Sequence, residues 1–180
     1  MNAEFNREKF KDAMHHVIAA AGDHPGFGAI KLYKVLWFSD AKTFQRSGAP
    51  ITGEEYIRRQ FGPVPKHGLE VRSELEREGR IKVWDDRYYD RTVTRFKSRQ
   101  PAITNRLSHD EILTLDYWAK HIDEDHTSSS ISDESHDYAW EIAKMGEVIP
   151  MTAYLANRWQ DPTKDQLAKA KKRLAGRGLF

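Results

Sequence analysis

The chain has 180 residues, of which 39% are hydrophobic, and its formal net charge is +2. This length fits one domain whose core is large enough to fold without cross-links. The chain contains no cysteine, which excludes disulfide bonds and cysteine-ligated zinc. Such a small net charge gives no general support for nucleic-acid binding, which needs a concentrated basic face.

The N-terminus lacks the basic and then apolar pattern of a signal peptide. No apolar run approaches the roughly 20 residues that a transmembrane helix requires. We therefore expect a soluble, cytoplasmic protein with no membrane partner.

The first two predicted elements are helices. Asn6 is suited to cap the first one, Phe5 and Phe10 have the spacing of a hydrophobic staple, and Gly22 ends the run. A second helix, from about Ala29 to Arg46, is apolar over more than half of its circumference. A helix of this kind is expected at the centre of the fold, packed on several sides.

The next segment changes character. Residues 56–61, bracketed by glycine and proline, predict a short extended segment. A helix is then expected from about Lys66 to Glu78, with Leu69, Val71 and Leu75 facing inward and Gly79 as its stop.

Two strands, residues 81–84 and 89–94, are predicted to form a hairpin that turns at residues 85–87. A lone hairpin is marginally stable in water. We therefore expect it to pack on helices or to pair with the extended segment that begins at Tyr56.

The last third of the chain is predicted to be helical again. Ser108 and Glu111 have the spacing of a capping box that opens a helix, whereas residues 123–132 are polar and serine-rich and predict an exposed loop. Short helices around Trp140 and Tyr154 follow, and a basic helix is expected from Pro162 to about Ala175.

These elements predict an α+β fold that is predominantly α-helical, a compact multi-helix domain with a small antiparallel β-hairpin or sheet. We expect a single domain over residues 1–180, in which residues 158–180 form a basic C-terminal helix and tail.

Charge is unevenly distributed. Residues 108–147 contain eleven acidic residues and two lysines, whereas residues 80–99 contain seven basic and three acidic residues, and residues 158–180 contain seven basic and two acidic residues. Such blocks either steer a charged partner or complement each other within one fold, and the sequence leaves both interpretations open.

Eight histidines raise the question of a metal site: His15, His16, His24, His67, His109, His121, His126 and His136. No pair has the helical His-x-x-x-His spacing that zinc prefers. His121, Asp125 and His126 can meet in a loop, which keeps a metal-dependent hydrolase as a less favoured hypothesis. The histidine count is explained by surface positions, so we predict no metal and no cofactor.

Ser135, His136 and Asp137 carry the residue types of a hydrolase triad, but adjacent side chains point apart, whereas triad members converge from distant positions. A local polar helix cap explains them better. The chain also lacks a nucleophile elbow and a glycine-rich phosphate loop. No catalytic residue is therefore predicted.

Aromatic and arginine residues are dense around the predicted hairpin, and these types dominate protein–protein hot spots. The same residues can stack on and pair with nucleic acid, or they can simply alternate between core and solvent. The candidate partner-binding residues are Arg58, Arg59, Trp84, Arg87, Tyr88, Tyr89 and Arg91.

A set of short motifs occurs in a fixed order: the helical stretch from Lys31 to Asp40, then Ile51-Thr52-Gly53, then Phe61-Gly62-Pro63-Val64, and later Ser135-His136 with Trp140, followed by Ile149-Pro150. This ordered set resembles the Panacea domain of SocA-like antitoxins, which also occurs in GepA-type phage-associated proteins. It departs from the family pattern at Asp133 and Glu134, where relatives often carry a more apolar residue.

The resemblance implies an α-rich fold with a small sheet and an antitoxin that is encoded beside its toxin and neutralises it by direct contact. Some relatives act as adaptors that present the toxin to a protease, and a homodimer is compatible with this role. A nucleic-acid-binding autoregulator is the alternative. The motif residues, which we interpret as mainly structural, are Lys31, Leu32, Trp37, Phe38, Asp40, Thr52, Gly53, Phe61, Gly62, Pro63, Val64, Ser135, His136, Trp140 and Pro150.

Overall fold

A computed structural model describes residues 4–89 and 91–159. Its helices are α1 (Arg7–Ala21), α2 (Ala29–Ser47), α3 (Gly68–Arg77), α4 (His109–Asp125), α5 (Ser128–Glu134), α6 (Tyr138–Ile142) and the 3-10 helix η1 (Met151–Trp159). Its strands are β1 (Tyr56–Arg59), β2 (Gly62–Pro65), β3 (Ile81–Tyr88) and β4 (Arg91–Ser98).

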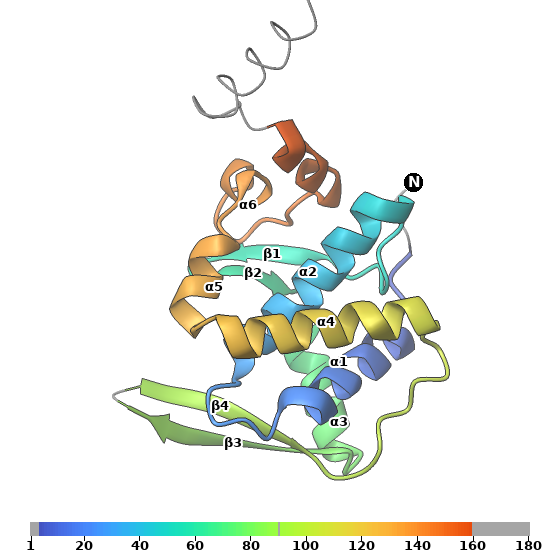
Figure 1. Cartoon of the computed structure of the whole chain (residues 1–180), viewed down its shortest axis with the longest axis vertical. Helices are drawn as coiled ribbons and strands as arrows, with labels where there is room; N and C mark the ends of the chain where they lie inside the picture. Colours follow the sequence, from blue (N-terminus) through green and yellow to red (C-terminus); the bar gives the residue numbers. More distant parts are fainter. Residues whose placement is uncertain (1–3, 90, 160–180) are drawn as a thin grey trace, which may run out of the picture.

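The predicted fold class, α+β with predominant helix, is confirmed. The strands form two separate antiparallel pairs, β1 with β2 and β3 with β4. Figure 1 places β1–β2, α6 and η1 on one side of α4. The longer β3–β4 hairpin lies on the other side, and its tip projects beyond the helices (Figure 1).

Helix α2 is the central element, as predicted. It contacts α1, α4, α5, η1 and both hairpins, and Leu32, Val35 and Trp37 on it are fully buried. The Trp37 ring meets the rings of Tyr56 and Tyr154 edge to face, with centroids 5.1 and 5.7 Å away. Aromatic packing from two other elements therefore fixes α2 between the β1–β2 hairpin and η1.

The predicted starts of α1 and α4 are confirmed. The Asn6 side chain accepts a hydrogen bond from Lys9 N, and the rings of Phe5 and Phe10 lie 5.9 Å apart, as a hydrophobic staple requires. Ser108 and Glu111 form the predicted capping box at the start of α4.

The predicted turn of the long hairpin, at residues 85–87, is wrong. These residues continue β3 and pair with Thr94, Val93 and Thr92 of β4. Polar residues suit this position because the strands project into solvent, and Asp85 accepts a hydrogen bond from the Thr94 hydroxyl at 2.9 Å. The chain turns after Tyr88 instead, where Tyr89 adopts φ = 52°.

The long hairpin packs on helices, which is one of the two arrangements predicted for it: β4 contacts α1 and α2, and β3 contacts α3. The segment from Tyr56 pairs with β2 instead. Two further predictions need correction. Most of the predicted loop 123–132 is helical, because Thr127 caps α5 and Ile131 is fully buried in the core. In α3, Val71 and Leu75 face inward as predicted, but Leu69 is 62% exposed.

The basic helix predicted from Pro162 to about Ala175 lies outside the described residues. No helix in residues 4–89 and 91–159 is long and apolar enough to span a lipid bilayer.

The two leucines of α3 provide a matched test of the core. Leu75→Ala removes a fully buried side chain and is expected to lower the free energy of unfolding by about 2–5 kcal/mol. Leu69→Ala, in the same helix, is expected to stay within about 0.5 kcal/mol of the wild type because the side chain is exposed. Chemical denaturation measures both, and equal losses would show that the inward face of α3 is misassigned.

Candidate functional site

Asp40 and Thr52, two motif residues, meet in a buried hydrogen-bond network between α2 and the loop before β1. The Asp40 carboxylate accepts hydrogen bonds from Thr52 N at 3.0 Å and the Thr52 hydroxyl at 2.6 Å. The Tyr56 hydroxyl also donates to it, at 2.8 Å. Burial raises the pKa of Asp40, and the hydrogen bonds from Thr52 and Tyr56 oppose that rise. The network ties the Ile-Thr-Gly turn to the central helix.

Lys34 and Gly62 form a second buried contact between α2 and the β1–β2 hairpin. Lys34 is 1% exposed, and its ammonium donates to the Pro63 carbonyl at 2.9 Å. Gly62 has φ = 93°, and a Cβ there would collide with the Ser135 hydroxyl and lie 2.5 Å from Lys34 Nζ. Glycine is therefore required both by the backbone conformation and by the lack of space. Burial lowers the pKa of Lys34 to about 7.

His136, Trp140 and Arg58 form a stack at the end of the β1–β2 hairpin. The His136 ring lies 3.9 Å from the Trp140 centroid at an interplanar angle of 19°, and the Arg58 guanidinium carbon lies 3.8 Å from the same centroid. Two groups this close to one ring must occupy opposite faces of it. The indole N–H donates to the Arg59 carbonyl at 3.1 Å. Cation–π and stacking contacts thus attach α6 to β1.

The remaining motif residues occupy both core and surface. Lys31 reaches from α2 to the C-terminal end of α4, where its ammonium donates to the Asp123 carbonyl at 3.1 Å. Leu32 and Phe38 are buried, and the Phe38 ring stacks on Trp118 at 4.9 Å. In contrast, Phe61 is 56% exposed, Pro150 is also exposed, and Gly53 and Val64 are half-buried.

Ser135, His136 and Asp137 do not converge. The Ser135 hydroxyl is fully buried and donates to the Ser132 carbonyl at 2.7 Å. The Asp137 carboxylate caps α6 by accepting from Trp140 N at 3.0 Å. His136 is occupied by its stack on Trp140. The three side chains serve as local helix caps and packing groups, as the sequence predicts.

His121, Asp125 and His126 meet at the end of α4. His121 Nδ1 lies 2.7 Å from the Asp125 carboxylate, and the two histidine rings are 5.1 Å apart. Nevertheless, no group of three or more histidine, aspartate or glutamate side chains in the described parts of the chain has an arrangement that could hold a metal ion.

The predicted partner-binding residues do not form one surface. Arg58 and Arg59 lie on β1, whereas the others lie on the β3–β4 hairpin, on the opposite side of α4 (Figure 1). Arg58 is committed to the Trp140 stack and donates to the Glu141 and Ala143 carbonyls. It is therefore part of the scaffold.

The hairpin residues differ in accessibility. Trp84 is half-buried beneath Arg95 and Lys82, whose charged groups lie 5.8 and 5.4 Å from its ring. Arg87 and Arg91 are exposed, and Tyr89 is 83% exposed at the tip. The side chain of Tyr88 lies outside the described ones. An exposed aromatic flanked by two arginines therefore marks the end of the hairpin.

A groove of about 640 Å³ runs between the outer half of β4 and the N-terminal ends of α2 and α5. Its floor and walls include apolar groups of Ile30 and Val93 and hydroxyl groups of α5. Tyr89 and Arg91 border it. Sequence reasoning identified these two residues but not the groove, because its walls come from segments about 35 to 65 residues away along the chain.

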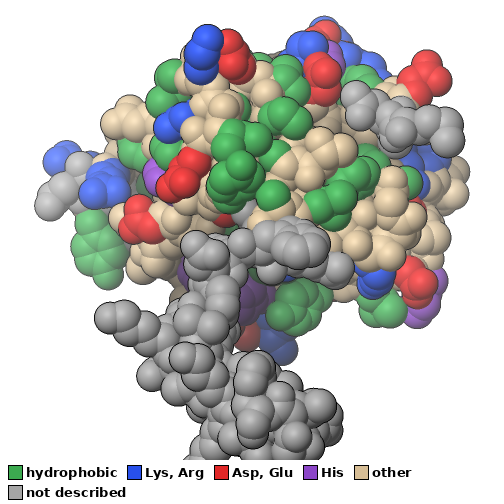
Figure 2. Space-filling model, turned by 90° about the horizontal axis from the view of Figure 1, so that it is seen from above, with side chains coloured by type: hydrophobic (Ala, Val, Ile, Leu, Met, Phe, Trp, Pro, Cys, Tyr) green, Lys and Arg blue, Asp and Glu red, His purple; other side chains and the backbone are tan. Residues whose placement is uncertain are grey.

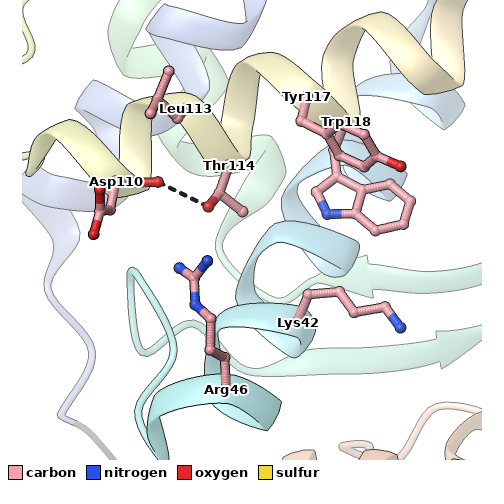
Figure 3. Close-up of a pocket in the computed structure, with 7 residues that line it drawn as sticks. All are labelled: Lys42, Arg46, Asp110, Leu113, Thr114, Tyr117 and Trp118. Atoms are coloured by element: carbon pink, nitrogen blue, oxygen red, sulfur yellow. Dashed lines mark hydrogen bonds between the residues drawn. The ribbon is translucent and has the colours of Figure 1, made fainter.

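A second hollow, of about 470 Å³, lies between α2 and α4. Figure 3 shows Lys42 and Arg46 of α2 on one side of it, and Leu113, Thr114 and Tyr117 of α4 on the other. Tyr117 is 60% exposed and Leu113 is 51% exposed. The cationic side chains of Lys42 and Arg46 lie at its edge.

A third surface is apolar. Seen from above, hydrophobic side chains gather on the face that carries α6 and η1 (Figure 2). The large exposed hydrophobic side chains described in α6, in η1 and in the loop between them are Tyr138, Ile142, Met145, Val148 and Leu155.

The acidic and basic blocks do not neutralise each other. Ion pairs of residues 108–147 with the rest of the described chain go to Lys9, His16, His24 and Lys31. Ion pairs of residues 80–99 go to acidic residues at positions 12, 23, 78 and 86. No ion pair between described residues joins the two blocks, so each block finds its partners elsewhere in the described chain.

Replacing Gly62 tests the buried contact with Lys34. Gly62→Ala is expected to lower the free energy of unfolding by about 3 kcal/mol, because a left-handed alanine costs about 1–2 kcal/mol and overpacking adds about 1–3 kcal/mol. Gly146→Ala is the control, since Gly146 has φ = 88° and nothing within 4 Å of an added Cβ. The free energy of unfolding of this control should fall only by the backbone cost of about 1–2 kcal/mol. Equal losses for the two variants would contradict the close packing around Gly62.

The low pKa of Lys34 predicts a pH dependence of stability. Because the folded-state pKa is about 7 and the ordinary value is 10.5, the unfolded chain binds more protons between these values. Stability from this group therefore rises as pH increases from 7 towards 10.5, with a limiting slope of about 1.4 kcal/mol per pH unit. Chemical denaturation at pH 7, 8 and 9 should show a gain in wild type relative to Lys34→Met. Parallel pH profiles would contradict the burial of a charge-bearing Lys34.

Comparison with protein-family models matches residues 32–141 to the family described as antitoxin SocA-like, Panacea domain. The matched region runs from α2 to α6 and includes the Asp40 network, the Lys34–Gly62 contact and the His136–Trp140 stack. Searches of curated proteins and of solved structures found no match. The match covers more than half of the chain, and the resemblance seen in its motifs is confirmed: this protein belongs to the SocA-like antitoxin, Panacea domain family.

Proposed function

We propose that this protein is an antitoxin that neutralises a cognate toxin by direct contact, and that the tip of the β3–β4 hairpin is its main binding surface. Membership of the antitoxin family supports the general role. The observation that supports this surface most strongly is the exposed Tyr89 between Arg87 and Arg91, on a tip that projects beside a groove.

The chemistry of the tip suits a protein partner. Tyrosine and arginine are enriched among residues that dominate protein interfaces. Asp85 and Asp86 lie on the same hairpin and offset its arginines, which favours a polypeptide over a nucleic-acid backbone. The hairpin is fixed to the loop before α2 at Arg95, which donates to the Pro25 carbonyl at 2.8 Å.

Action by binding, without catalysis, is part of the proposal. It is supported by the family and by the buried state of Ser135, whose hydroxyl has no exposure to solvent and is already engaged with the Ser132 carbonyl. Delivery of the toxin to a protease would use the same first step, because an adaptor must also bind its cargo.

The proposal predicts that Tyr89→Ala weakens binding of the neighbouring gene's product at least 30-fold, because a hot-spot side chain contributes about 2 kcal/mol or more. Loss of growth rescue in a co-expression assay should accompany the loss of affinity. Tyr117→Ala is a matched control, since Tyr117 is 60% exposed but lies on α4. It should retain affinity within about threefold of wild type.

Calorimetry on the purified proteins gives the affinities, and circular dichroism checks that both variants fold. A wild-type protein that neither binds the neighbouring gene's product nor rescues growth would overturn the antitoxin proposal. Equal effects of the two variants would instead overturn the choice of the hairpin.

A further inference from the structure

We infer that the toxin binds by adding an extended segment of its own chain to the open edge of β4 at Thr92. This inference rests on the proposed function and names the kind of contact that the hairpin makes. The inference is supported by the outward direction of backbone N–H and C=O groups in β4 and by the groove beside them.

The first step is the direction of the backbone groups. Arg87 N donates to its neighbour's carboxylate, Asp86 Oδ1, at 2.8 Å, and Val83 N donates to Glu76 Oε1 at 3.1 Å. These two N–H groups of β3 therefore point away from β4. In an antiparallel ladder, the two residues of a directly opposed pair behave alike. If the residue in β3 directs its N–H and C=O away from β4, the residue opposite it in β4 directs its own groups away from β3.

The register then identifies the residues of β4 that point outward. Arg87 lies opposite Thr92, and Val83 lies opposite Phe96. Because the pattern alternates, Thr92, Thr94 and Phe96 all direct their backbone groups to the edge of β4 that does not face β3.

The body of the protein covers only part of this edge. The Phe96 carbonyl faces Gly22, where an added Cβ would lie 3.1 Å from it, and the Thr94 carbonyl faces Gly28, where the corresponding distance is 3.2 Å. Both glycines allow close approach of the chain to the strand. Thr92, one step further out, makes no hydrogen bond on this edge to any described residue and instead lines the 640 Å³ groove.

An extended polypeptide matches what this edge offers. Unpaired strand edges are templates for a further strand, which would lie about 4.8 Å from β4. Peptides that bind in this way gain affinity from main-chain hydrogen bonds and specificity from pockets for alternate side chains. Here the groove supplies the pocket, because Ile30 and Val93 line it.

Side-chain chemistry narrows the sequence of the incoming segment. Arg91 and Val93 are two residues apart in β4 and therefore lie on the same face of the hairpin. Arg91 is exposed and basic, and Val93 is half-buried and apolar. Cross-strand pairing then favours an acidic residue and an apolar residue two positions apart in the toxin segment.

Proline at position 92 tests the backbone directly. Thr92→Pro removes the outward N–H without removing a hydrogen bond between β3 and β4. The affinity for the neighbouring gene's product is expected to fall at least 30-fold. Thr92→Ala keeps the N–H and removes only the exposed side chain, so its affinity should stay within threefold of wild type.

A second measurement covers the case in which the proline variant does not fold. In the wild-type complex, hydrogen exchange of the Thr92 amide, followed by NMR, should slow at least tenfold relative to the free protein. The Arg87 amide, on the other edge of the hairpin, should not change.

The outcomes separate the two proposals. If the wild type binds and the proline and alanine variants have equal affinity, or if the Thr92 amide is not protected, strand addition is wrong while the antitoxin role stands. Protection of Thr92 without the neighbouring gene's product, dependent on protein concentration, would assign the edge to a second copy of this chain. If the wild type does not bind that product at all, the proposed function fails, and this inference fails with it.

Discussion

Two buried polar side chains of α2 fix the β1–β2 hairpin and the turn before it to the centre of the fold. Asp40 accepts hydrogen bonds from Thr52 and Tyr56, and Lys34 donates to the Pro63 carbonyl. An unpaired buried polar group is costly, so each of these contacts strongly specifies its partner segment. Together they attach both ends of the segment from Thr52 to Pro63 to the central helix, and Gly62 brings Ser135 close to Lys34.

This arrangement explains why many of the family motifs are internal. Ser135 and Gly62 are buried, and the stack of His136, Trp140 and Arg58 fastens α6 to β1. Residues engaged in this way have little surface to offer a partner. The β3–β4 hairpin, by contrast, lies largely outside this framework and carries its exposed Tyr89 at the end of a ribbon that Arg95 anchors.

The sequence predicted elements whose signals are local. The caps at Asn6 and Ser108 and the central apolar helix were correct, because capping and periodicity depend only on neighbouring residues. The turn at residues 85–87 was wrong because polar residues also suit a strand exposed on both faces. The groove beside Thr92 could not be predicted, since it arises from the packing of distant segments and from backbone direction. The lysine at position 34, inside the largely apolar stretch from Leu32 to Phe38, was an available signal of a buried contact.

The most direct test of the binding surface is a hydrogen-exchange footprint of the complex with the neighbouring gene's product. Binding at the hairpin predicts slower exchange at residues 89, 91–94 and 127–129, which border one groove, and unchanged exchange at α6 and residues 145–148. The exposed apolar side chains of that second region offer a competing surface (Figure 2). Protection there, with none at the hairpin, would contradict the assignment of the binding surface.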